Sequence, residues 1–79
     1  MSMENKIREI SKEHRTVEEV ISALDSNLEK IYFIDKQINL NLTNQAIVCL
    51  LGNPKLAVGI QETIDRLIER KKEINAERD

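Results

Sequence analysis

The fold is decided by residues 3–31, which read MENKIREISKEHRTVEEVISALDSNLEKI. Apolar or near-apolar side chains recur in this stretch at alternating spacings of four and three residues, at Met3, Ile7, Ile10, His14, Val17, Ile21, Leu24, Leu28 and Ile31. A heptad repeat sustained in this way is typical of a coiled-coil helix. Neither Gly nor Pro occurs before Gly52, so the pattern predicts one long helix over residues 1–40.

The stretch after this helix is ambiguous. Residues 38–42, Ile-Asn-Leu-Asn-Leu, alternate in polarity as a strand does. Thr43 also suits the N-cap of a short helix, which Gly52 would end. We expect a helical tip over residues 41–53, with a β-hairpin as the alternative.

The β-hairpin alternative has a known counterpart. The turn Leu51-Gly52-Asn53-Pro54 would separate two strands, and a charged helix from Glu62 to Arg78 would follow. This order of helix, β-hairpin and helix resembles the layout of prefoldin β subunits. The resemblance implies two helices joined by a β-structured tip.

A second helix follows the tip. Asn53 suits an N-cap and Pro54 the first helical position, so a helix is predicted over residues 54–76, with 77–79 as a frayed tail. The short connector favours an antiparallel hairpin. Folding the chain about residues 46–47 places Ile60 opposite Ile34 and Lys71 near Leu24.

These elements predict an all-α single domain over residues 1–79, a long antiparallel helical hairpin or coiled coil. In this register residues 1–15 extend beyond the second helix, and their apolar side chains lack a partner. We therefore expect an oligomeric helical bundle, with a homodimer first and a higher oligomer as the alternative. The expected interface consists of Met3, Ile7, Ile10, His14, Val17, Ile21 and Leu24.

Composition excludes several classes of protein. Twelve Lys and Arg against fourteen Asp and Glu give a net charge of −2, which argues against nucleic-acid binding. The single Cys49 fits a reducing cytosol, and the N-terminus lacks the apolar core of a signal peptide. No apolar run is long enough to span a bilayer. We expect a cytoplasmic protein without a membrane partner. Its many Ile, Asn and Lys residues are typical of an AT-rich bacterial or phage genome.

No arrangement of residues indicates catalysis. The chain has no Gly-rich phosphate loop, no Ser-His-Asp order and no metal-ligand spacing. We interpret His14 as a polar residue that sets helix register, and Cys49 as core filling. The sequence predicts no catalytic residue, no cofactor and no metal, and thus a protein that is not an enzyme.

The function favoured is that of an adaptor, inhibitor or small chaperone. The apolar inventory exceeds what one hairpin seam absorbs, so we expect the remainder to bind another macromolecule, an unidentified protein. The expected contact residues are Tyr32, Phe33, Val48 and Leu51.

Two alternatives come from other classes. An oligomer interface could hold a nucleotide or phosphorylated metabolite near His14, Lys30 and Tyr32. The anion contacts would then be Arg66, Arg70, Lys71 and Lys72. A helix-turn-helix DNA-binding regulator is disfavoured, because residues 55–59, where a recognition helix would start, are nearly all apolar.

Overall fold

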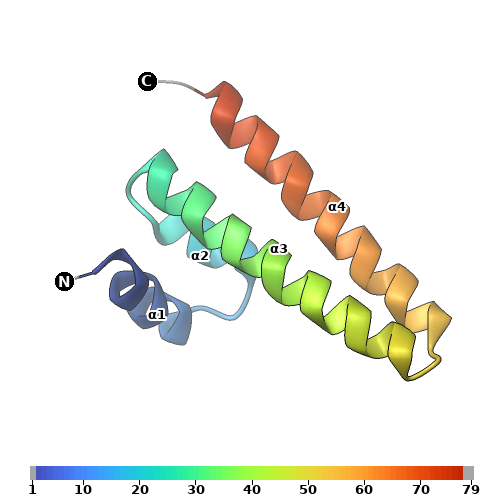
Figure 1. Cartoon of the computed structure of the whole chain (residues 1–79). Helices are drawn as coiled ribbons and strands as arrows, with labels where there is room; N and C mark the ends of the chain where they lie inside the picture. The colour runs from blue at the N-terminus through green and yellow to red at the C-terminus, as the bar shows by residue number, and fades with distance from the viewer. Residues whose placement is uncertain (1, 78–79) are drawn as a thin grey trace. The chain divides into compact units, whose positions relative to one another are not determined.

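A computed structural model of the chain describes residues 2–77. Within this range the chain forms four helices, α1 (Met3–Glu13), α2 (Val17–Ala23), α3 (Asn27–Leu50) and α4 (Pro54–Ala76) (Figure 1). No strand occurs among these residues, which confirms the all-α class and excludes the β-hairpin tip with its prefoldin-like layout. Residues 78 and 79 of the predicted frayed tail lie outside the described residues.

The chain divides into two compact units, Met1–Phe33 and Ile34–Asp79. Helices α1 and α2 belong to the first unit and α4 to the second, whereas α3 begins in the first and ends in the second. The expectation of a single domain stays a prediction.

The prediction of one helix over residues 1–40 is wrong, because the chain leaves the helical conformation twice. His14 ends α1 with a φ of −127° and a ψ of 150°, and Leu24 ends α2 with a φ of −80° and a ψ of 142°. Both pairs of angles are those of extended backbone. The heptad spacing runs through both breaks.

Each break is followed by a capped helix start. The Thr16 side chain accepts a hydrogen bond from the Glu19 amide at 3.2 Å, and Ser26 accepts one from the Glu29 amide at 3.2 Å. The Glu29 carboxylate in turn accepts from the Ser26 amide at 3.2 Å, which completes a capping box. These caps satisfy amides that a helix start leaves without a helical partner, and they stabilise two separate helices.

The first unit has its own core. Helix α1 packs closely against α2, and the buried apolar side chains of this unit are Ile7, Val20, Ile21, Leu24 and Phe33. Lys6 of α1 lies 3.0 Å from Asp25 and 2.8 Å from Glu29, measured from Nζ to carboxylate oxygen. The expectation that the apolar side chains of residues 1–15 lack a partner within the chain is therefore wrong, because α1 packs against α2.

The Lys6 pair makes the stability of this unit depend on pH. Hydrogen bonds to Glu29 and then Asp25 raise the pKa of Lys6, and the bond from Lys6 lowers the pKa of Glu29 from its ordinary value. A lowered carboxyl pKa contributes stability above its unfolded value, and that contribution is lost as pH falls through the folded value. We expect Lys6→Met to lower the melting temperature slightly at neutral pH, because solvent screens the exposed pair, and to lose this effect in acid, where the carboxyl group of Glu29 is protonated.

Circular dichroism melts over a pH series test this expectation. Lys12→Met is the control, since the partner of Lys12 is the exposed Glu9 of its own helix, at 3.7 Å. The expectation would be contradicted if the difference in melting temperature between Lys6→Met and the parent were the same at neutral and at acid pH.

The second unit contains a helical hairpin with a tight turn. Gly52, with a φ of 76°, follows α3, and Asn53 caps α4 by accepting a hydrogen bond from the Leu56 amide at 3.3 Å. Pro54 occupies the first turn, where a missing amide hydrogen costs nothing. The predicted helix over residues 54–76 is confirmed, with these bounds.

The two glycines of the hairpin, Gly52 in the turn and Gly59 inside α4, allow a matched pair of substitutions. A Cβ added at Gly52 or Gly59 would meet no atom within 4 Å, so the two positions differ only in backbone conformation. Gly52→Ala should lose about 1 kcal/mol because of its positive φ, whereas Gly59→Ala should gain about 0.5–1 kcal/mol inside α4. Urea unfolding measures both, and changes of equal sign would contradict this account.

The hairpin register differs from the predicted one. Gln45 Nε2 donates to the Ala57 carbonyl at 3.3 Å and to Gln61 Oε1 at 2.8 Å. Lys71 Nζ lies 2.8 Å from Asp35 Oδ1. The Gln45–Gln61 and Asp35–Lys71 pairs are both symmetric about residue 53, so the predicted fold about residues 46–47 is wrong, and Lys71 pairs with Asp35.

The reason is that residues 41–50 continue α3 instead of forming a separate tip. The Thr43 hydroxyl does not cap a new helix. It donates to the Asn39 carbonyl one turn earlier, at 3.1 Å, as hydroxyl side chains do inside helices.

A charge exchange tests the register. Asp35→Lys and Lys71→Asp should each lower stability by up to about 1 kcal/mol, because both side chains are partly exposed and solvent screens the pair. The double variant should recover most of the loss in urea unfolding. Lys72→Asp is the control, because Lys72 pairs with Glu69 of its own helix, and it should not rescue Asp35→Lys. Equal rescue by both would contradict the register.

Candidate functional site

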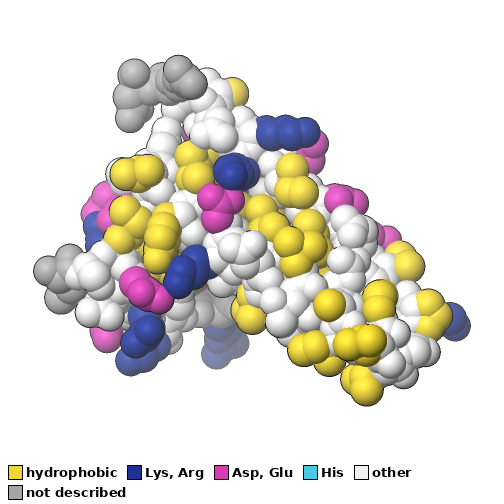
Figure 2. All heavy atoms as spheres, viewed as in Figure 1, with side chains coloured by type: hydrophobic (Ala, Val, Ile, Leu, Met, Phe, Trp, Pro, Cys, Tyr) yellow, Lys and Arg dark blue, Asp and Glu magenta, His cyan; other side chains and the backbone are white. Residues whose placement is uncertain are grey.

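The end of the α3–α4 hairpin displays a group of exposed apolar side chains. Ile47, Leu50, Leu51 and Leu56, here called the tip surface, are 49%, 87%, 78% and 53% exposed. Figure 2 shows apolar side chains gathered at this end of the hairpin, at the lower right. Single exposed leucines are common on proteins, but adjoining ones mark sites of interaction.

The same region is almost without charge. Lys55 is the only charged residue between Gln37 and Gln61, although a third of the whole chain is charged. Charged groups are costly to remove from water and are depleted in the centres of protein interfaces. The charge-poor segment and the exposed apolar side chains therefore indicate the same kind of surface.

Near the end of α3 two polar side chains are half-buried, whereas apolar ones are exposed. Asn41 and Gln45 are half-buried, and Gln45 contacts α4 as described above, whereas Leu40 is exposed. Leu40, Asn44, Ile47 and Leu51 recur at spacings of four, three and four residues and are all exposed. Such residues share one face of a helix. We call this face the outer stripe.

The structure divides the predicted partner-binding residues. Leu51 belongs to the tip surface, and Val48 is half-buried in the same unit. Tyr32 is half-buried and Phe33 is only 4% exposed, and both lie in the other unit. Phe33 is therefore not available as a surface contact. Cys49 is exposed, so its interpretation as core filling is wrong.

The predicted oligomer interface lies entirely in the first unit. Ile7, Ile21 and Leu24 are buried within the single chain. The remaining members, Met3, Ile10, His14 and Val17, are half-buried. An interface role for these residues stays a prediction, but the argument from unmatched side chains no longer supports it.

An open hollow of about 480 Å³ lies in the first unit, lined by His14, Glu18, Glu19, Ser22 and Ala23. His14 Nδ1 is 3.9 Å from Glu19 Oε2. Two carboxylates repel a phosphate group, so the lining disfavours a phosphorylated ligand.

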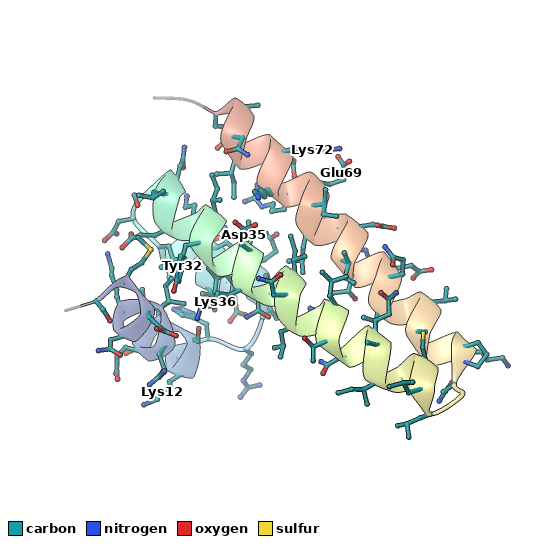
Figure 3. All side chains as sticks on the ribbon, viewed as in Figure 1. Lys12, Tyr32, Asp35, Lys36, Glu69 and Lys72 are labelled. Atoms are coloured by element: carbon teal, nitrogen blue, oxygen red, sulfur yellow. The ribbon has the colours of Figure 1, made fainter. Side chains whose placement is uncertain are left out.

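The predicted anion contacts lie beside carboxylates on or near α4. Lys71 pairs with Asp35, Lys72 lies 3.6 Å from Glu69, and Arg70 lies 4.0 Å from Glu73. Figure 3 labels Asp35 on α3 and the Glu69–Lys72 pair on α4. Arg66 is exposed. An acidic neighbour thus offsets the positive charge of Arg70, Lys71 and Lys72, which disfavours a site that binds anions.

Among residues 2–77 no group of three or more His, Cys, Asp or Glu side chains is placed to hold a metal ion. None of the described helices combines the length and the apolar character needed to cross a bilayer. No protein-family model, curated protein or solved structure matches the chain.

The tip surface is thus the feature with the clearest functional content, and sequence reasoning identified only Leu51 of it. The missed signal was the charge-poor segment from Gln37 to Gln61. The helical period could not show that the leucines of the tip surface are exposed, because their exposure depends on the hairpin register.

Proposed function

We propose that this chain is a non-enzymatic interaction protein, an adaptor, inhibitor or small chaperone, that binds another protein through the tip surface. The observation that carries the proposal is the exposure of four large apolar side chains at the charge-poor end of the hairpin. A cytoplasmic location belongs to this proposal, because a reducing compartment keeps the exposed Cys49 as a thiol.

The size of the tip surface suggests a reversible contact. Burying one Leu or Ile side chain contributes about 1.5–3 kcal/mol. Association costs about 4–15 kcal/mol in lost freedom of movement. Four such side chains contribute at most about 6–12 kcal/mol, which is similar in size to the cost of association. A contribution of this size suits a transient partner better than a permanent one.

The phosphorylated-ligand alternative has less support. Glu18 and Glu19 line the hollow of the first unit, and three of the four predicted anion contacts lie beside carboxylates. A DNA-binding regulator has less support still, because α4 begins with exposed apolar residues such as Leu56 and Val58.

Site-specific photo-crosslinking in growing cells tests the proposal. A photoreactive amino acid replaces Leu50, and the matched control carries it at Glu69, on α4. We expect discrete protein products from position 50 that are absent from position 69 and are lost when Leu51→Asp is added. Position 50 giving no product beyond those of position 69 would show the proposed function to be wrong.

A further inference from the structure

The outer stripe has the residue pattern of a helix-pairing surface. Leu40, Ile47 and Leu51 are 55%, 49% and 78% exposed, and Asn44 between them is exposed as well. Their spacing corresponds to heptad positions d, a, d and a. The side chains that face α4, such as Gln45, lie elsewhere on the helix, so the stripe is open to a second helix.

The chemistry of the stripe favours an identical partner. In a two-fold interface each residue meets the same surface on the other copy, so like charges would repel. The segment from Gln37 to Gln61 carries Lys55 as its only charge, and Lys55 is not part of the stripe. Its apolar side chains are compatible with themselves.

Asn44 selects the orientation. In a parallel pair, position a faces position a, so the two Asn44 amides meet, and each can donate to and accept from the other. In an antiparallel pair, Asn44 would face an apolar d position such as Ile47. A buried amide without a partner costs about 1–3 kcal/mol. The parallel arrangement avoids this cost.

We propose that a second copy of this chain docks on the outer stripe, with the two α3 helices parallel about a two-fold axis and the two Asn44 side chains facing each other. The inference rests on the proposed function, because Ile47 and Leu51 of the stripe also belong to the tip surface, and it names a second copy of the chain as a protein that this surface binds. Leu40, Ile47 and Leu51 each pack against their own counterparts.

Sedimentation equilibrium over micromolar to submillimolar concentrations tests the pairing. The parent should rise from its monomer mass of 9.1 kDa to twice that mass. Ile47→Asp should raise the dissociation constant by ~100-fold or more, because two buried carboxylates enter one interface. Leu42→Asp is the matched control, since Leu42 is 46% exposed but lies on the opposite side of α3. It should change the constant by less than ~3-fold.

Disulfide formation tests the orientation. Asn44→Cys combined with Cys49→Ser leaves one thiol on the two-fold axis, and mild oxidation should link two chains. The parent chain is the control, because its single exposed Cys49 lies on the side of α3 away from the stripe. Both chains carry one thiol, so the comparison isolates position.

Three results would overturn the self-pairing. They are a monomer at every concentration, a dimer that survives Ile47→Asp, and equal crosslinking by the parent and the Asn44→Cys chain. These failures differ from failure of the proposed function. If position 50 crosslinks to a different protein while the chain stays monomeric, the tip surface binds a partner and only the self-pairing is lost.

Discussion

Replacing Ile64 with Ala should lower the free energy of unfolding by about 2–5 kcal/mol. Ile64 is 2% exposed and lies on the buried face of α4 with Ala57, Leu67 and Ile74. Truncation removes apolar contacts and leaves a cavity that the rigid helix closes only in part. Urea unfolding followed by circular dichroism, at a low protein concentration, measures the loss.

Leu50→Ala is the matched control for this experiment. It removes a similar volume from a side chain that is 87% exposed, so it should change stability by less than about 0.5 kcal/mol. The contrast separates residues that hold the hairpin together from residues that are free to bind. Similar losses at positions 50 and 64 would show that Leu50 is covered in the folded chain, and the tip surface would not exist.

Local capping explains why the sequence predicted helical structure over residues 1–40 but not the two breaks within it. The heptad pattern from Met3 to Ile31 is real, yet it describes two short amphipathic helices and the start of a third as well as it describes one long helix. The signals that decide between these options are Thr16 with Glu19 and Ser26 with Glu29. A capping residue competes with helix continuation. The heptad spacing carries no information about this competition.

The second helix was predictable because its signals are local. Gly52, Asn53 and Pro54 each act on their own backbone, through a positive φ, a side-chain cap and a fixed φ. The hairpin register was not predictable from the same data. It depends on α3 continuing to Leu50, which sets the symmetric pairs Gln45–Gln61 and Asp35–Lys71 about residue 53.

The hairpin register also decides which apolar side chains form the candidate site. Phe33 and Leu51 are both large apolar residues in the sequence, but the structure buries the first and exposes the second. Composition alone could not separate them. In this part of α3 the polar side chains of Asn41 and Gln45 are half-buried, and Gln45 contacts α4. They occupy positions at which a hairpin would ordinarily place apolar side chains, so the nearby leucines are left exposed.

Asn44→Leu should tighten self-association by at least ~10-fold. The substitution makes the outer stripe apolar along its whole length, and each dimer buries two additional Leu side chains, at about 1.5–3 kcal/mol for each. A polar residue at a single a position fixes orientation and oligomer state at a cost in stability. Its removal should therefore also loosen the parallel orientation and permit larger assemblies.

Both effects are measurable on the same protein. Sedimentation equilibrium gives the dissociation constant and the mass, and a spin label on the native Cys49 gives the distance between the two copies of α3. The parent should show one narrow distance distribution and Asn44→Leu a broader one. Asn39→Leu is the control, because it makes the same substitution at an exposed position off the stripe and should change neither quantity. If Asn44→Leu weakens association, or leaves it as it is in the parent, Asn44 does not lie in a pairing surface, and the α3 stripe is not the site at which two chains meet.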